Sequence, residues 1–364
     1  MMKRYLLLLL VTLGLLAGCA TNPVTGKNEL SLVSEAQELA IGAQQYSPAR
    51  QSQGGDYVVD RQLTAYVNEV GQRLAAVSDR KLPYEFKVLN SSVPNAWALP
   101  GGKISINRGL LTELRSESEL AAVLGHEIVH AAARHGAQQM SKGMLLQTAV
   151  LGTVVATQGK NYGNLAQMGA NIGAQLISQK YGRDAERETD YYGMQYMVRA
   201  GYDPQGAVDL QRTFVKLSEA KRQDWLSGLF ARHPPSQGRV RRNMELLATL
   251  PKGGERGVES YRAKTSHLMR SKPAYEAYDK GREALSRGDL ATASRLAKRS
   301  VAREPKDALL SGLRGAVEQK KRPRNSAIKQ AGQDSRMYRT FFFDSHQRCT
   351  VYESSHRIEP SSND

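Results

Sequence analysis

The sequence predicts an α+β chain, in which a mostly helical domain with a small sheet is followed by an all-α module of helical repeats. Two short stretches, 84–89 and 103–107, alternate apolar and polar residues as half-buried strands do. The region 110–250 has mainly helical periodicity. Nearer the C-terminus, small residues recur with a 34-residue period, which is typical of tetratricopeptide-like repeats.

Residues 1–18 have the pattern of a lipoprotein signal peptide. Two basic residues precede an apolar run at 5–17, and the chain continues Leu-Ala-Gly-Cys at 16–19, as in a bacterial lipobox. The run is shorter than the roughly 20 residues that span a bilayer. We therefore expect Cys19 to be acylated and to anchor the chain to membrane lipid in the cell envelope. Because Ala20 rather than Asp follows it, the periplasmic face of the outer membrane is favoured. An ordinary cleaved signal with a chance cysteine is the alternative.

Composition sets further limits on the class of protein. The 364 residues leave room for more than one domain, and the second cysteine, Cys349, has no intramolecular disulfide partner once Cys19 is acylated. The net charge is +16, and residues 252–364 carry 24 Lys and Arg against 14 Asp and Glu. These basic residues could bind anionic lipid or an acidic partner, or could simply solvate helix surfaces. For an exported chain we expect no nucleic acid partner.

The first part of the mature chain is expected to begin with a polar tether at 19–30. Ser34 follows as the N-cap of a helix, because its hydroxyl can accept a hydrogen bond from a free backbone N–H group. A second, amphipathic helix is expected at 60–76. Between the two predicted strands, Pro-Gly-Gly at 100–102 forces a turn.

The segment 140–179 is rich in Ala, Gly, Gln and Met, with an apolar patch at 144–156. The patch is too short and too interrupted to span a membrane. It is consistent with a helical hairpin that covers the functional site as a lid, or with a plain buried pair of helices.

The C-terminal third begins with a glycine-containing linker at 252–270. Residues 271–335 are expected to form degenerate tetratricopeptide-like repeats, and a plain helical hairpin is the alternative. The residues at repeat spacing are Gly281, Gly288, Ala293, Pro305, Gly315 and Ala327. The irregular tail at 336–364 matches neither a repeat nor a linker.

The strongest functional signal is the run His-Glu-Ile-Val-His at 126–130, inside an apolar, helix-favouring stretch. Positions i and i+4 of a helix lie about 40° apart, so His126 and His130 can bind one Zn²⁺ ion. Glu127 is then placed to accept a proton from the attacking water. Because the pattern can also arise by chance, other residues must support it.

A catalytic zinc site needs a third protein ligand. In a second predicted helix, Glu186 and Asp190 stand four residues apart on one face, whereas Glu188 points nearly opposite. We therefore expect Glu186 to be the ligand and Asp190 to hydrogen-bond the distal nitrogen of a ligating histidine. The alternative is a solvated face on which the carboxylates pair with Arg183 and Arg187.

Together these stretches resemble the zinc metallopeptidases of family 48, the HtpX, Oma and Ste type, including its bacterial lipoprotein members. The likeness extends over about 20–250, with Thr189 where the family usually has Ala. The stretches that carry it are Asn-Pro-Val-Thr-Gly at 22–26 with Ser34-Glu35, then 95–102 leading into 108–111, Gly125 to His130 with 133–136, and 186–190 with Gly193. The resemblance implies a zincin-type domain at 31–251 and one zinc ion per chain.

The resemblance also gives significance to His233, in Arg-His-Pro-Pro at 232–235 followed by Arg239. It implies that His233 is a reversible fourth ligand or an oxyanion stabiliser; from spacing alone it would be a loop histidine. His135, nine residues after His126, would lie on the opposite side of a continuing helix. The remaining histidines, expected at the surface, are His267, His346 and His356.

The activity that the resemblance implies is zinc-dependent endopeptidase cleavage of unfolded or misassembled envelope proteins. An extended peptide would pair with a strand along the edge of the cleft. The residues expected to form that edge are Lys103, Ile104, Ser105 and Ile106. The repeats would recruit substrate or the outer-membrane assembly machinery. The alternative is a chaperone or assembly factor whose site is plugged by His233 or by the lid. A purely structural zinc site is disfavoured because Glu127 would then have no role.

Overall fold

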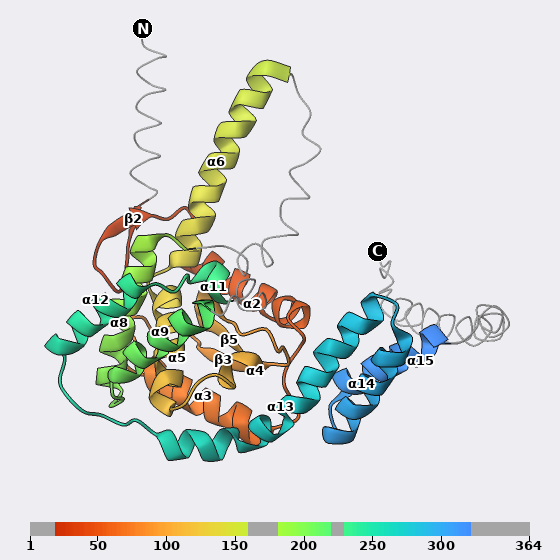
Figure 1. Cartoon of the computed structure of the whole chain (residues 1–364). Coiled ribbons are helices and arrows are strands. Elements are labelled where there is room, and N and C mark those ends of the chain that lie inside the picture. The colour runs from red at the N-terminus through yellow and green to blue at the C-terminus, as the bar shows by residue number, and fades with distance from the viewer. Residues whose placement is uncertain (1–18, 159–180, 220–228, 322–364) are drawn as a thin grey trace, which may run out of the picture. The chain divides into compact units, whose positions relative to one another are not determined.

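The computed structural model describes residues 19–158, 181–219 and 229–321 (Figure 1). The expected signal peptide, the second half of the expected lid and the expected tail lie outside these residues. The chain divides into two compact units between Lys272 and Pro273. The predicted α+β class is confirmed, since helices pack around a small sheet in the first unit and the described part of the second is helical.

The first unit begins with β1 (Cys19–Thr21), β2 (Asn28–Leu30), α2 (Glu35–Ser52), α3 (Arg61–Ala75), β3 (Glu85–Leu89), β4 (Ala96–Leu99), the 3-10 turn η1 (Pro100–Gly102) and β5 (Lys103–Asn107). It continues with α4 (Arg108–Leu111), α5 (Glu117–Ala132), α6 (His135–Gln158), α8 (Arg183–Arg199), α9 (Gln205–Glu219), α11 (Leu229–Arg232) and α12 (Gln237–Thr249). Then follow α13 (Val258–Ser286), in which the division between the units falls, α14 (Leu290–Arg303) and α15 (Ala308–Lys321).

The three-stranded sheet has the order β3-β5-β4, with β5 parallel to β3 and antiparallel to β4. This order corrects the expectation that Lys103, Ile104, Ser105 and Ile106 form a free edge. They lie in the central strand, and neighbours occupy both of its sides.

The sequence did not reveal β4, because Ala-Trp-Ala-Leu is buried on both faces and lacks alternation. Gly101 and Gly102, with φ of 74° and 78°, turn β4 back onto β5.

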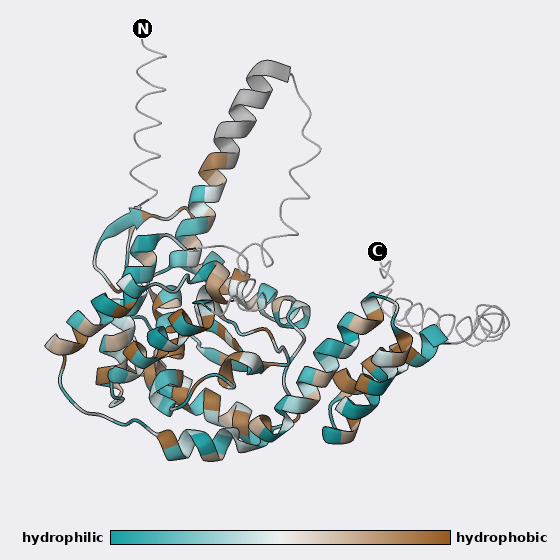
Figure 2. Ribbon diagram, in the orientation of Figure 1, coloured by the Kyte–Doolittle hydropathy of each residue, from teal (hydrophilic) through white to brown (hydrophobic). Residues whose placement is uncertain are grey.

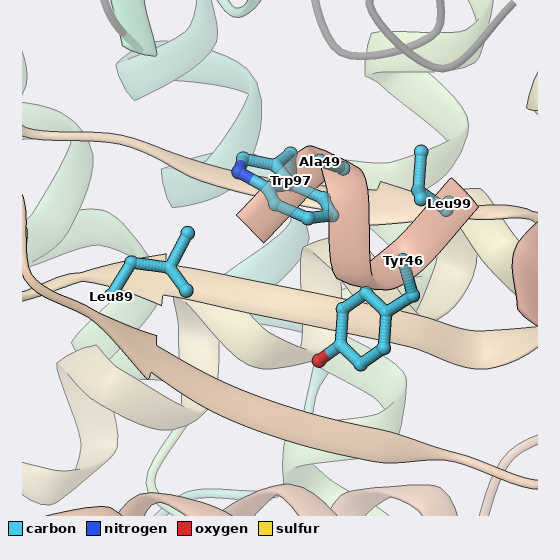
Figure 3. Close-up of a cluster of buried hydrophobic side chains, with 5 residues drawn as sticks. All are labelled: Tyr46, Ala49, Leu89, Trp97 and Leu99. Carbon is cyan, nitrogen blue, oxygen red and sulfur yellow. The ribbon is translucent and has the colours of Figure 1, made fainter. Parts of the chain in front are cut away.

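An aromatic and aliphatic cluster packs α2 against this sheet (Figure 3). Tyr46 meets Trp97 edge to face, with ring centroids 6.0 Å apart, and its hydroxyl donates to the Ile104 carbonyl at 2.6 Å. Ala49, Leu89 and Leu99 complete the cluster. The helix α2 begins as the sequence predicts, with Ser34 as its N-cap. Gln37 completes a capping box with Ser34.

The helix that carries the His-Glu-Ile-Val-His run is α5, which packs against α3, α8, α9 and the sheet (Figure 1). Ser116 caps its N-terminus, accepting a hydrogen bond from the Glu119 N–H group at 3.1 Å. Every residue of α5 except His126 is buried. A single buried helix therefore holds His126, Glu127 and His130 in place.

Two segments expected to be irregular are ordered instead. The expected tether is a β-hairpin that pairs β1 with β2, and the Asn22 side chain closes its turn by accepting from the Val24 and Thr25 N–H groups. The expected linker is helical from Val258 onward. There Tyr261 is 2% exposed and donates to the Leu111 carbonyl at 2.6 Å, so this segment belongs to the core of the first unit.

The described part of the second unit runs from Pro273 to Lys321, and α14 packs on α15. Gly281 lies against Leu313 and Leu296, which belong to these two helices. The tetratricopeptide-like assignment stays a prediction.

In the first unit, α6 extends away from the helices around α5 (Figure 1). It carries a band of hydrophobic residues (Figure 2), and Met144, Leu145 and Leu146 are exposed there. Over the described ranges, no helix has both the length and the apolar character needed to cross a membrane.

Candidate metal centre

The close approach of α5 to α8 brings the predicted ligands together. A Cβ atom on Gly125 would lie 3.3 Å from the Gly193 carbonyl oxygen, and one on Gly193 would lie 3.3 Å from the His126 nitrogen. Glycine at both positions therefore lets the two backbones touch. From this crossing, His126 and His130 on α5 face Glu186 on α8.

The three predicted ligands have the spacing of a zinc site. The Nε2 atoms of His126 and His130 lie 3.2 Å apart. The Oε1 atom of Glu186 lies 3.5 Å from His130 Nε2, and its Oε2 atom lies 3.7 Å from His126 Nε2. Ligand atoms around one tetrahedral zinc ion, bonded at about 2.0 to 2.1 Å, are about 3.3 Å apart. The donor set and its spacing thus fit zinc.

His233 joins this group from the loop after α11, and one donor atom from each of the four residues lies within 4.8 Å of the others. Its Nδ1 lies 2.7 Å from Glu186 Oε1 and 3.2 Å from His126 Nε2. Its Nε2 lies 3.6 Å from Glu127 Oε1. Within the described part of the chain, His233 Nε2 and Glu127 Oε2 are buried without a hydrogen-bond partner. Buried polar atoms without a hydrogen-bond partner, next to a cluster of metal-ligating atoms, indicate a place for a bound group.

The electrostatics of the centre favour a bound cation. Burial holds the pKa of His130 well below its usual value, which keeps a nitrogen lone pair available. Burial alone would raise the pKa of Glu186, but the charge of His233 and hydrogen bonds from His130 and His233 outweigh it, so this pKa lies well below its usual value. Burial likewise opposes charge on His126, yet Asp190 and Glu186 raise its pKa. The pocket therefore combines an ionised carboxylate with imidazoles.

Asp190 lies where the sequence places it, with Oδ1 3.4 Å from Nδ1 of His126. A residue whose role the sequence did not reveal holds it there. Arg239, on α12, donates to both Asp190 oxygens at 2.8 and 2.6 Å, and its Nη1 lies 3.1 Å from Glu186 Oε2. Because Arg239 is only 5% exposed, it orients both carboxylates within the protein.

The expectation that His135 lies on the far side of the helix from the ligands is wrong. His135 Nδ1 lies 2.9 Å from His130 Nδ1, and His135 Nε2 lies 3.1 Å from Glu188 Oε2. The helix does not continue to His135, because Arg134 has a φ of 61° and ends it. Arg134 is held in this conformation by Glu38 Oε2 at 2.9 Å and the Val33 carbonyl at 2.7 Å.

Tyr181 is a second contact that the sequence did not indicate. Its ring stacks on His130, with centroids 3.9 Å apart and an interplanar angle of 23°. Tyr181 is 6% exposed and covers one face of this imidazole.

A cavity adjoins the centre on the side of Glu127 and His233. Its wall is mostly apolar, with side chains from α8, α9 and α11: Met194, Met197, Ala207, Leu210, Phe214 and Leu229. Gln211 also lines it, and among the described atoms its Oε1 is buried without a partner.

Comparison with known proteins agrees with this geometry. A sequence model of peptidase family M48 matches residues 61–246. The chain is 32% identical over 200 residues to the beta-barrel assembly-enhancing protease of Yersinia pestis, covering 53% of this chain and 41% of that protein. It is 31% identical over 229 residues to the mitochondrial metalloendopeptidase OMA1 of Schizosaccharomyces pombe, covering 62% and 65%.

A third relative is the metalloprotease YcaL of Escherichia coli, 27% identical over 255 residues, which cover 68% of this chain and 98% of YcaL. The chain spans less than two thirds of the length of the assembly-enhancing protease and of OMA1.

Replacing Glu186 with Gln should lower zinc affinity by at least about 100-fold, because loss of a charged ligand exceeds the 10- to 100-fold effect of losing a supporting contact. Competition with a chromophoric chelator measures this. Asp184→Asn is the matched control, since this carboxylate lies on the same helix with its side chain 91% exposed. Unchanged zinc affinity in Glu186→Gln would contradict its assignment as a ligand.

Proposed function

The chain belongs to peptidase family M48, and from this premise we propose that it is a membrane-anchored endopeptidase that cleaves unfolded or misassembled proteins of the cell envelope. The observation that supports this best is the convergence of His126, His130 and Glu186 beside Glu127. The names of two relatives, a beta-barrel assembly-enhancing protease and a mitochondrial metalloendopeptidase, are consistent with protein substrates.

His126, His130 and Glu186 would hold the zinc ion, which supplies Lewis-acid chemistry by polarising the scissile carbonyl and making a water molecule more acidic. Glu127 is the general base of this scheme. It is 1% exposed, and one of its oxygens has no hydrogen-bond partner in the described part of the chain. This oxygen is free to accept the proton of the attacking water and later to deliver it to the leaving amine.

His233 has two possible roles in this scheme. Its unpartnered Nε2 atom could donate to the oxyanion of the tetrahedral intermediate. Alternatively its imidazole could act as a fourth metal ligand, since Nδ1 lies 2.7 Å from Glu186. In the second role His233 would keep the site latent until it moves.

An extended substrate would pair with β4 rather than with β5, since β4 forms one side of the described sheet. The outer side of β4 is contacted by α11. The Leu229 N–H group donates to the Pro94 carbonyl at 3.0 Å, and Arg232 Nη1 lies 3.4 Å from the Ala96 carbonyl oxygen. Peptide pairing along this side therefore requires α11 to shift, which agrees with a site that opens only for particular substrates.

Replacing Glu127 with Gln should lower kcat for an unfolded protein by at least about 100-fold, because general acid–base catalysis contributes 10² to 10⁴. As a control, the zinc content and the thermal stability of the Glu127→Gln variant should equal those of the wild type. The measurement is release of fluorescence from a labelled unfolded protein. Cleavage at the wild-type rate would exclude the proposed mechanism.

A second candidate function is a chaperone or assembly factor with a mostly latent site. The contact of His233 with Glu186 and the position of α11 on β4 favour it. The same Glu127→Gln variant separates the two functions in cells. If cells with this variant keep an intact envelope, the chaperone function is supported; if the envelope becomes permeable as in a deletion strain, cleavage is required.

The apolar cavity is placed to receive a substrate side chain next to the scissile bond. The variant Ala207→Leu narrows this cavity. It should lower kcat/KM about 10-fold for peptides with a large apolar residue at the position that enters the cavity, and much less for peptides with Gly at that position. The reason is that small changes in the size of an apolar group alter pocket binding by about 10- to 200-fold. Ala43→Leu, on an exposed position of α2, is the control. Equal losses for both peptides would contradict this use of the cavity.

We further propose that acylated Cys19 anchors the chain on the periplasmic face of the outer membrane. Cys19→Ser should abolish labelling with an alkyne fatty acid and move the chain out of the membrane fraction, because the thiol and the new amino terminus carry the acyl chains. The control is Cys349→Ser, which removes the second cysteine in the sequence. Full labelling of Cys19→Ser would refute the anchor.

A further inference from the structure

The distal nitrogen of His130 contacts another imidazole instead of a carboxylate. His130 Nδ1 lies 2.9 Å from His135 Nδ1, and His135 Nε2 lies 3.1 Å from Glu188 Oε2. We propose that His135 and Glu188 are positioning residues, which fix the ring orientation and the tautomer of His130 so that its Nε2 faces the metal. The proposal rests on the metal centre of the proposed function, and we call His130, His135 and Glu188 the relay.

Counting hydrogens along the relay assigns each proton. A carboxylate only accepts, so His135 carries its hydrogen on Nε2, toward Glu188. With a single hydrogen on the His135 ring, its Nδ1 atom has a lone pair and accepts from Nδ1–H of His130. His130 is left with a lone pair on Nε2, the atom that lies 3.2 Å from His126 Nε2 and 3.5 Å from Glu186. The relay thus selects the tautomer of His130 that can bind a metal.

Burial makes this hydrogen bonding obligatory. His130 and His135 are 1% and 2% exposed, so water cannot readily replace either partner. Tyr181 stacks on His130 and restrains the tilt of its ring, whereas the hydrogen bond to His135 restrains its rotation. His126 is supported differently, by direct contact between Nδ1 and Asp190. The two histidine ligands therefore depend on different residues and can be perturbed separately.

The backbone at Arg134 makes the relay possible. Its φ of 61° ends α5 and begins α6 with His135, which returns toward His130. At the outer end, Lys27 of the N-terminal hairpin lies 3.7 Å from Glu188 Oε1. The Lys27 side chain is 72% exposed, and an exposed ion pair of this kind contributes little. The relay therefore ends at Glu188, and Lys27 provides a neutral control position.

The test measures metal binding by the full-length chain in detergent, with zinc or cobalt alone as the probe. His135→Leu removes the acceptor for His130 and should weaken zinc binding by about 10- to 100-fold. His135→Asn can keep an acceptor near the Nδ1 position and should lose less. Glu188→Ala should weaken zinc binding by a smaller factor than His135→Leu, and Lys27→Ala should leave it unchanged. Chelator competition gives the affinities.

Two further readouts separate positioning from a merely structural role. The visible spectrum of the cobalt-substituted protein should change in His135→Leu and stay as in the wild type in Lys27→Ala, because only the former alters the ligand field. The thermal midpoint of the metal-free protein reports folding. If His135→Leu does not fold, His135→Asn and Glu188→Ala still decide the question.

The relay is refuted if folded His135 and Glu188 variants bind zinc as tightly as the wild type with unchanged cobalt spectra. Because the readout is metal affinity, wild-type protein that binds zinc without cleaving peptides would contradict the proposed endopeptidase function alone.

Discussion

The metal centre depends on the contact between two helix backbones at Gly125 and Gly193. A methyl group at either position would lie 3.3 Å from the opposite backbone, tighter than most such contacts, so the helices would have to separate. The donor atoms of His126, His130 and Glu186 are within 3.7 Å of one another only because α5 and α8 cross this closely. The ligands are thus supplied by side chains, but the distance between the histidines on α5 and Glu186 on α8 is set by the absence of side chains at Gly125 and Gly193.

This crossing also buries charges that need compensation. Glu186 and Arg239 are 7% and 5% exposed, and removing such groups from water costs several kcal/mol for each ion unless they are paired. Arg239 compensates Asp190 and contacts Glu186, whereas the imidazoles present several lone pairs to one small volume. A bound cation satisfies these lone pairs, so zinc binding contributes to the stability of the folded state as well as to chemistry.

The sequence was most informative where a regular helix sets the geometry. At 100° per residue, spacing alone predicts that His126 and His130 share one helix face and that Glu186 and Asp190 share another. The structure brings these two faces together. The same rule misplaced His135, because Arg134 leaves the helix. That departure depends on contacts with distant residues such as Glu38, which no local pattern reveals. The strand β4 was missed for a related reason, since burial on both faces removes alternation.

The short segment 229–233 contacts both the sheet and the candidate metal centre. Its helix, α11, contacts the carbonyl groups of Pro94, just before β4, and of Ala96, the first residue of β4. The residue after that helix, His233, contacts Glu186 and faces Glu127. The His233 N–H group also donates to the Leu229 carbonyl at 2.8 Å, which ties the imidazole to the helix. A displacement that freed β4 for peptide pairing would therefore also move His233 relative to the metal ligands.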